Sequence, residues 1–390
     1  MNILFVSIDG DPAYAGGTAT IVQLMASWLQ SHGHFCALGY FQESKHPATF
    51  FKDRVRLTAN NEKELVELNK IHELDILYVT QCIGIDWSLL RRYFPKAKII
   101  AAYHSRPMLM CPTRRTLGVF LRGNFSCFSK FKVLFYWLLY PLYRYVTQSK
   151  EKKHFRELAS NCDKLQLLSK GFIPVFKKII PQFDGEKIFC IGNPVVWNQT
   201  VNEDDITRKE RNVLVVCNAN HPKRAHLMIE IWKKIEQDRN WDDWTFTFVG
   251  DSNEVQLLKQ KALKEYRLRR IKFVGRQMPL KYYLKSRIFL MTSAFEGWPM
   301  VLMESMQMGC VPIAFNSFES VYDIIEDKEN GIIVENNDID TYVEKLKWLM
   351  RNGAECEKMA LNATHIAEKY SIDNIMQRYM VEFNKIITVL

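Results

Sequence analysis

The sequence predicts an α/β protein with two doubly wound domains and a ligand cleft between them. Three observations support this fold class. Strand and helix patterns alternate along the chain, which is typical of parallel sheets covered by helices. At 390 residues, the chain is longer than a single hydrophobic core usually supports. A polar and charged stretch at residues 197–211 interrupts the alternation and separates two halves.

In the first half, short apolar runs mark the expected strands at 3–8, 35–41, 75–81, 97–104, 164–169 and 187–192. A helix is expected at 17–33, between the first two runs. Its apolar residues Ile21, Leu24, Met25, Trp28 and Leu29 follow helical spacing, and the glycine at position 33 ends it. We therefore predict a first domain over residues 1–195.

In the second half, strands are expected at 213–217, 245–249, 271–275, 288–292, 311–315 and 331–335. Helices are expected near 222–237, 254–267, 338–352 and 372–388, and a further helix begins at Pro299. We therefore predict a second domain over 196–369 and a final helical segment over 370–390. No short internal repeat is present.

The composition narrows the classes of protein and of partner. The net charge is +10, but no zinc-finger spacing, recognition-helix pattern or aromatic ribonucleoprotein motif is present, so no nucleic-acid partner is expected. The nine cysteines include no C-x-x-C pair, which favours a reducing compartment over disulfides or zinc. We expect a cytoplasmic protein with no signal peptide and no spanning helix.

Residues 111–150 combine positive charge with aromatic side chains. The segment holds seven Lys or Arg residues, ten aromatic residues and no acidic residue. Basic residues interleaved with aromatics and leucines suit an element that lies in a lipid interface. The alternative is that residues 133–140 form a buried helix of the first domain. Both interpretations stay open, and the first one predicts peripheral contact with the anionic inner face of the cell membrane.

The most informative motif is a pair of glutamates, Glu296 and Glu304, eight residues apart around Gly297 and Pro299. Glu296 is expected in the turn after a strand, and Glu304 on the helix that follows. Proline is tolerated at a helix start, where the unpaired N–H groups and the helix dipole attract anions. Two carboxylates beside a phosphate site suit a ligand with a phosphate and two sets of hydroxyls, which describes a nucleotide-sugar.

This block resembles the E-G-x-P-x-x-x-x-E signature of the retaining glycosyltransferases of family 4, with Ser305 and Gln307 departing from the usual small residues. The resemblance implies two Rossmann-like domains in the GT-B arrangement, with an acceptor-binding first domain and a donor-binding second domain. The last helix would cross back onto the first domain. Glu304 would bind the ribose, and Glu296 would bind and orient the transferred sugar. The backbone of residues between them would hold the diphosphate, namely Gly297, Trp298, Pro299, Met300, Val301 and Leu302.

The resemblance assigns further site residues outside this block. His104, at the end of a strand, would reach the transferred sugar and is taken as catalytic together with Glu296. Gly16 and Gly17 would let backbone approach the donor at the start of the first helix. Lys223 matches the family's phosphate-binding lysine, whereas its usual arginine is missing.

Asn218 stands near the place of that missing arginine. Arg224, next to Lys223, is the first candidate to replace it, and Arg276 is the second. Cations at this place would clamp a diphosphate and offset the charge that develops on the leaving group. We include Asn218 and Arg224 among the donor-binding residues.

The sequence thus predicts a retaining glycosyltransferase that moves a sugar from a nucleotide-sugar to a saccharide or lipid-linked saccharide, in cell-surface polysaccharide or lipopolysaccharide synthesis. Neither a metal nor another cofactor is expected, because no acidic cluster suggests one. Retention without a protein nucleophile fits a same-face substitution in which the departing phosphate takes the acceptor proton. Two alternatives remain: a nicotinamide- or nucleotide-binding oxidoreductase, and a non-catalytic nucleotide-sugar sensor. The absence of G-x-G-x-x-G counts against the first.

Overall fold

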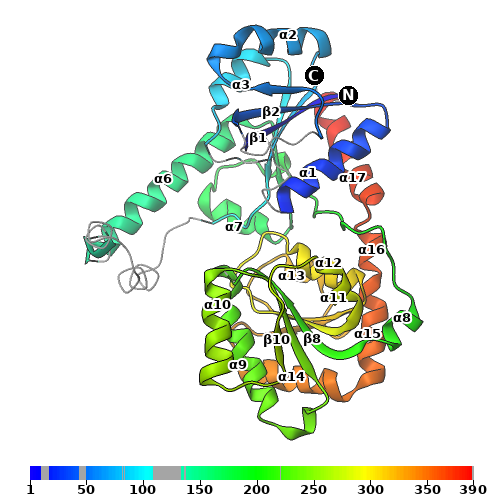
Figure 1. Ribbon diagram of the computed structural model, residues 1–390. Helices are drawn as coiled ribbons and strands as arrows, with labels where there is room; N and C mark the ends of the chain where they lie inside the picture. Colours follow the sequence, from blue (N-terminus) through cyan, green and yellow to red (C-terminus); the bar gives the residue numbers. More distant parts are fainter. Residues whose placement is uncertain are drawn as a thin grey trace.

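The computed structural model describes residues 1–9, 17–43, 50–80, 82, 84–108, 133–135, 138–219 and 221–388. The strands in these residues form two parallel sheets, one of seven strands and one of six. Figure 1 shows the two sheets as separate bodies, with β1 and β2 in the upper one and β8 and β10 in the lower one. The predicted α/β class with two doubly wound domains is confirmed. The boundaries at 195 and 369 stay predictions.

The first sheet has the strand order β3-β2-β1-β4-β5-β6-β7. Its strands are β1 (Asn2–Asp9), β2 (Phe35–Gln42), β3 (Arg54–Arg56), β4 (Ile76–Val79), β5 (Lys98–Tyr103), β6 (Lys164–Leu167) and β7 (Ile188–Cys190). The order reverses between β1 and β4, so the loops after these strands diverge and leave a crevice at their carboxyl ends. The three-residue β3 is too short for an apolar pattern and was not expected from the sequence.

Helices cover this sheet on both sides. They are α1 (Gly17–Ser31), α2 (Glu62–His72), α3 (Trp87–Tyr93), α6 (Tyr140–Asn161) and α7 (Phe172–Ile179). The helix predicted at 17–33 is confirmed as α1, which buries Ile21, Met25 and Leu29. Gly33 follows it with a φ of 81°, in the left-handed region that glycine adopts freely.

The second sheet has the order β10-β9-β8-β11-β12-β13. Its strands are β8 (Glu210–Val216), β9 (Thr245–Val249), β10 (Ile271–Phe273), β11 (Ser286–Met291), β12 (Val311–Phe315) and β13 (Ile332–Val334). Here the order reverses between β8 and β11. The loops that leave these two strands carry Lys223 and Glu296, so both residues lie where doubly wound sheets bind ligands.

The helices of the second domain lie on both faces of its sheet. They are α8 (Glu203–Thr207), α9 (Ala225–Glu236), α10 (Asn253–Gln260), α11 (Leu280–Lys285), α12 (Met300–Gln307), α13 (Val321–Ile324), α14 (Ile339–Arg351), α15 (Gly353–Thr364) and α16 (Ile366–Lys369). A short π-helical segment at Lys261–Glu265 extends α10. The predicted helix near 222–237 starts later, at Ala225, because residues His221–Lys223 form a 3₁₀ turn.

The last helix, α17 (Ile372–Thr388), packs beside α1 of the first domain (Figure 1). The indole N–H of Trp28 donates to Asp373, and the hydroxyls of Tyr78 and Tyr379 lie 3.2 Å apart in the core. Tyr78 also donates to Gln166, so a buried polar contact joins β4, β6 and α17. The final helix therefore fastens the second domain to the first.

Helix α6 extends away from the upper body, as Figure 1 shows. Large apolar side chains are exposed on and just before its first half: Leu134, Phe135, Leu138, Leu139, Leu142, Tyr145 and Val146. The interpretation of 133–140 as a buried helix is therefore wrong for the residues described there. Residues 111–132, 136 and 137, which belong to the same prediction, lie outside the described residues. Among the described helices, none is both long and apolar enough to span a bilayer.

Candidate active site in the cleft between the domains

A cleft of about 410 Å³ lies between the two domains. The first domain contributes residues that follow carboxyl ends of strands or begin α1, and the second contributes the loops after β8 and β11. The lining residues are Gly17, Thr18, Tyr103, His104, Ser105, Arg106, Met108, Asn193, Pro222, Lys223, Phe295, Glu296, Gly297, Trp298 and Met300. The structure thus brings together seven of the predicted site residues that it describes: Gly17, His104, Lys223, Glu296, Gly297, Trp298 and Met300.

The loop before α12 fits closely against the first domain. A Cβ on Gly297 would lie 2.6 Å from the carbonyl oxygen of His104, so glycine is needed for this approach. A Cβ on Gly192 would lie 2.3 Å from the ring of Trp298, which is 7% exposed and also packs on Tyr370. The side chain of Trp298 therefore joins the domains, and only its backbone is left for a ligand.

Helix α12 begins directly after Pro299 and points its first turn at the cleft through Met300. The first N–H groups of a helix have no intrahelical acceptor, which makes them suitable for an anion. The N–H of Leu302 already donates to the carbonyl of Pro299, and its side chain is fully buried. We therefore remove Leu302 from the predicted phosphate contacts and retain the N–H groups of Met300 and Val301.

Glu296 and Lys223 form an ion pair inside the cleft. The Lys223 ammonium donates to Oε1 of Glu296 at 2.6 Å, and the two side chains are 25% and 14% exposed. Partial burial strengthens such a pair relative to one on the open surface. Lysine carries three donors, so the ammonium can hold Glu296 and still offer hydrogens to a phosphate.

Glu304 has a different environment, one turn into α12. Its Oε2 accepts a hydrogen bond of 3.0 Å from the hydroxyl of Tyr283, a fully buried residue of α11. Burial raises the pKa of Glu304, and the Tyr283 hydroxyl opposes that shift. The side chain does not line the cleft itself. Tyr283 was missed from the sequence because its relation to Glu304 depends on packing between two helices.

His104 lies on the cleft with both ring nitrogens buried and without hydrogen-bond partners among the described residues. Burial lowers the pKa of His104 to about 4. The ring is therefore neutral at pH 7, with one donor and one acceptor nitrogen. It can exchange hydrogen bonds with a hydroxyl but carries no positive charge.

Asn193 is a further polar residue on the cleft that was not predicted from the sequence. It is 5% exposed, its amide donates to the sulfur of Met300 at 3.7 Å, and its Oδ1 has no partner among the described residues. Unpaired buried polar atoms are costly, so a ligand hydroxyl would be favoured here. A lone Asn before a proline gives no such signal in sequence.

The structure does not support a phosphate-binding role for Arg224. Its guanidinium donates to the carbonyl oxygens of Thr292 and Ser293 and to Oδ1 of Asn337, at 2.6 to 2.9 Å. It also lies over the ring of Phe315. These contacts hold the loop that carries Glu296, and Arg224 does not line the cleft.

The remaining candidates of the sequence lie after β8, after β10 and before α1, and the structure does not place all of them on the cleft. Asn218 is exposed outside the cleft lining, and its carbonyl accepts from Ser252, so the structure gives it no place among the phosphate contacts. Arg276 is exposed after β10 and does not line the cleft. Gly16 lies outside the described residues. Gly17 begins α1 on the cleft, and a Cβ on Gly17 would lie 3.5 Å from the side chain of Met300.

An ion pair also spans the domains beside the cleft. The Arg106 guanidinium donates to both carboxylate oxygens of Glu319, at 2.7 and 2.6 Å. Burial alone would raise the pKa of Glu319, but Arg106 outweighs it and the net shift is downward. Such bidentate pairs have a fixed geometry, so this pair sets the spacing of the two domains at one side of the cleft.

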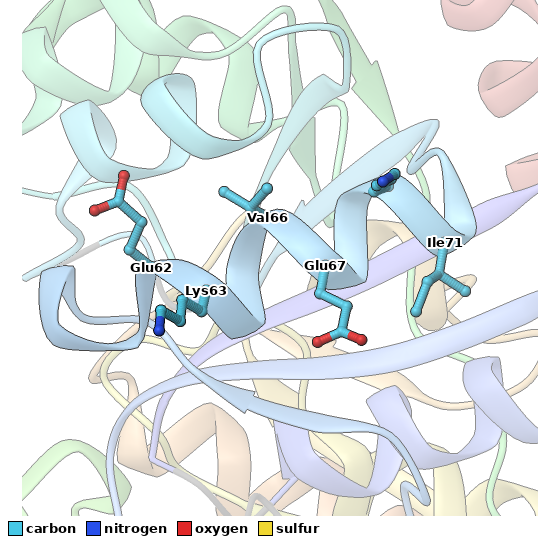
Figure 2. A pocket seen from close by; sticks show the side chains of 6 residues that line it. Glu62, Lys63, Val66, Glu67 and Ile71 are labelled. Atoms are coloured by element: carbon cyan, nitrogen blue, oxygen red, sulfur yellow. The ribbon is translucent and has the colours of Figure 1, made fainter.

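A second hollow, of about 610 Å³, lies along the outer surface of α2 (Figure 2). Figure 2 shows Glu62, Lys63, Val66, Glu67 and Ile71 pointing away from a single helix. These side chains converge on no common point and include no histidine, cysteine or serine. The hollow therefore carries no candidate chemistry, and the cleft remains the candidate active site.

Comparison with known proteins agrees with this placement. Residues 199–366 match the family model described as "Glycosyl transferases group 1". A protein named "Uncharacterized glycosyltransferase", from Haemophilus influenzae, is 26% identical over 222 residues, which cover 56% of this chain and 61% of that protein. The amylovoran biosynthesis glycosyltransferase AmsD of Erwinia amylovora is 26% identical over 202 residues, which cover 50% of this chain and 56% of that one. The chain thus matches less than two thirds of the length of either relative.

Solved structures share the fold over the whole chain. Anabaena Alr3699/HepE, solved with UDP, has a TM-score of 0.73 at 14% identity and covers 99% of this chain and 100% of its own. The sucrose-phosphate synthase of Thermosynechococcus elongatus has a TM-score of 0.72 at 15% identity and covers both chains fully, at 100% each. At such low identity these likenesses establish the two-domain GT-B fold alone.

Proposed function

The chain belongs to the glycosyl transferases group 1 through residues 199–366, and we propose that it transfers a sugar from a nucleotide-sugar donor to a saccharide or lipid-linked saccharide acceptor. The observation that carries this proposal is the Lys223–Glu296 ion pair beside the N-terminus of α12, at the switch point of the second sheet. A cation and free helix N–H groups suit a diphosphate. A carboxylate at their edge suits the hydroxyls of the attached sugar.

In this proposal the second domain binds the donor. Glu304 accepts hydrogen bonds from the ribose hydroxyls, and Lys223 holds the diphosphate together with the N–H groups of Met300 and Val301. Glu296 binds hydroxyls of the transferred sugar, with neutral His104 facing it from the first domain. The group 1 family match argues against the oxidoreductase alternative. A non-catalytic sugar-binding protein would use the same contacts, so activity must be measured.

The reaction we propose proceeds with retention of the anomeric configuration. The bond between the anomeric carbon and the phosphate oxygen breaks, and the acceptor oxygen bonds to the same face of that carbon. The acceptor proton passes to the departing phosphate oxygen, so no protein nucleophile is needed. Lys223 and the helix N-terminus stabilise the charge that develops on the phosphate. That no metal takes part stays a prediction.

The acceptor side of the proposal rests on the first domain. Relatives from Campylobacter jejuni and Escherichia coli are named for transfer to diphosphoundecaprenol-linked sugars. The exposed apolar residues of α6, next to the basic side chains of Arg144 and Lys150, suit contact with an anionic membrane. We propose peripheral attachment to the cytoplasmic face, with synthesis of a cell-surface polysaccharide or lipopolysaccharide.

The first experiment screens thermal stabilisation by UDP-, GDP- and ADP-sugars and by nicotinamide cofactors, and then measures transfer to acceptor mixtures with the sugar that stabilises the protein. Stabilisation by a nucleotide-sugar followed by turnover supports the proposal. Stabilisation by NAD alone would overturn it, and binding without turnover on any acceptor would favour the non-catalytic alternative.

Membrane attachment has a separate test. Sedimentation with vesicles of phosphatidylglycerol and phosphatidylcholine should fall when Leu138, Leu142 and Tyr145 are changed to serine, because about 0.8 kcal/mol is lost for each buried methylene. The matched control changes Val66 and Ile71, exposed apolar residues of α2, to serine and should leave sedimentation unchanged. Equal vesicle binding by both variants would remove α6 from the proposal.

A further inference from the structure

The carboxylate of Glu304 is held by a hydrogen bond from Tyr283, and Tyr283 is held in turn by buried donors of the second domain. Its Oε2 accepts from the Tyr283 hydroxyl at 3.0 Å, while its Oε1 accepts from no described residue. One carboxylate oxygen is therefore fixed by the protein, and the other is open to a ligand hydroxyl. The ring of Tyr283 is 0% exposed, so its hydroxyl cannot turn to water without disturbing the core.

Tyr283 is itself fixed at the end of α11 by buried donors. The ammonium of Lys209, which is 5% exposed, donates to the carbonyl oxygens of Tyr283 at 2.6 Å and of Leu284 at 3.1 Å. The thiol of Cys310 donates to the same Tyr283 carbonyl at 3.1 Å. A cation at a helix C-terminus is favourable because the last carbonyls lack intrahelical donors. Burial of Lys209 is thus compensated, and the end of α11 is bonded to the segments before β8 and after α12.

We propose that Tyr283 is a positioning residue that holds Glu304 in one orientation and keeps it ionised for binding the ribose hydroxyls of the donor. The proposal rests on the role of Glu304 in the proposed function. An ionised carboxylate only accepts hydrogen bonds and accepts stronger ones than the protonated acid, so two neighbouring hydroxyls are bound best by a charged and correctly turned side chain. Burial at this place disfavours the anion and raises the pKa of Glu304, and the hydrogen bond from Tyr283 opposes that shift.

A single substitution at Tyr283 can distinguish a positioning role from simple packing in the core. Tyr283→Phe keeps the ring in the core and removes only the hydroxyl. The carboxyl of Glu304 then loses the hydrogen bond that stabilises its anion, so its pKa rises further above the usual range. Protonation will weaken nucleotide binding as the pH falls, and in the variant that loss begins at a higher pH. A packing defect alone would weaken binding equally at every pH.

The experiment measures the Kd of UDP by calorimetry at pH 8 and at pH 6, with GDP or ADP in its place if the wild-type chain prefers one of them. In Tyr283→Phe we expect at most a threefold loss at pH 8 and on the order of a tenfold loss at pH 6, since a hydrogen bond to a charged group is worth about 1.5–3 kcal/mol. The matched control is Tyr282→Phe, because Tyr282 is the neighbouring, half-buried tyrosine of α11 and its hydroxyl makes no hydrogen bond to a described residue.

A double-mutant cycle completes the test. In a Glu304→Gln background, Tyr283→Phe should cause no further pH-dependent loss, because no carboxyl remains to titrate. A pH-independent loss in Tyr283→Phe, or a loss equal to that of Tyr282→Phe, would overturn the positioning role. Unchanged UDP affinity in Glu304→Gln alone would instead show that the assignment of Glu304 in the proposed function has failed, and the inference with it. A thermal melt of each variant verifies that it is folded.

Discussion

The two glutamates of the cleft motif sit in opposite kinds of environment. Glu296 lies on a loop and is paired with a cation, Lys223, that a donor phosphate would also attract. Glu304 lies on α12 and is held by a neutral hydroxyl, Tyr283, inside the domain. A charged partner can be shared with a ligand, whereas a buried neutral one stays in place. The difference suggests that Glu296 changes its contacts during the reaction, while Glu304 provides a fixed anchor.

Glu296→Gln should produce the largest effect on turnover. The amide keeps the size of the side chain but removes the charge that orients the transferred sugar opposite Lys223. We expect kcat to fall by about 100-fold or more, as for other groups that act in the transition state. The Kd of the nucleoside diphosphate without its sugar should change by less than about threefold.

The matched control for this prediction is Glu329→Gln, since Glu329 is an exposed glutamate of the same domain outside the cleft. Radiolabelled sugar transfer and calorimetry on the same preparations give the two quantities. Full transfer by Glu296→Gln would show that the loop glutamate has no part in the reaction and would remove the contrast between the two sites.

Lys223→Met should affect donor binding more than any other single change in the second domain. The variant keeps the apolar stem and removes the ammonium that bonds Glu296, so the diphosphate loses a charge-assisted contact. We expect UDP to bind about 10- to 100-fold more weakly, while uridine, which lacks phosphates, binds as before. Lys285→Met removes an exposed lysine and is the control. Equal losses for UDP and uridine would mean that the pair serves only to shape the loop.

The positions of the two glutamates could be predicted from the sequence, but the side chains that hold them in place could not. The glutamate spacing, the proline at the helix start and the strand ends predicted the positions of Glu296, His104 and Lys223, because these signals are local and follow the strand–helix alternation. Arg224 was misassigned because sequence shows its charge but not the direction of its side chain. Tyr283 and Asn193 were missed since their roles arise from packing between segments that are distant along the chain.

Arg224→Met tests whether the loop of Glu296 depends on the half-buried guanidinium of Arg224. The variant leaves the carbonyl oxygens of Thr292 and Ser293 without the guanidinium donors. Lost hydrogen bonds to buried groups are destabilising, so the melting temperature should fall by several degrees, about 2–4 °C for each kcal/mol. Turnover should fall by about tenfold, while the pH dependence of UDP binding stays unchanged. The control is Arg276→Met, an exposed arginine outside the cleft. A specific loss of UDP affinity with normal stability would restore Arg224 as a phosphate ligand.

Glu304→Gln should have the smallest effect on transfer. It is the most diagnostic variant because it should change stability and UDP affinity in opposite directions. Burial raises the folded-state pKa of Glu304, so its contribution to stability is present at low pH and is lost as the pH rises through that pKa. At pH 8 the ionised side chain therefore costs stability, and the neutral amide should raise the melting temperature, by on the order of 2 °C.

The same variant should weaken UDP binding by about tenfold, since an amide is a poorer partner for two ribose hydroxyls than a carboxylate. The stability gain should shrink toward pH 4, where the wild-type carboxyl is protonated. Scanning calorimetry at both pH values, beside titrations with UDP, measures both signs. A residue whose charge weakens the fold but strengthens binding is retained for its ligand. A loss of both stability and affinity at pH 8 would instead make Glu304 a structural residue. Glu296 would then be the one glutamate of the motif with a role in the reaction.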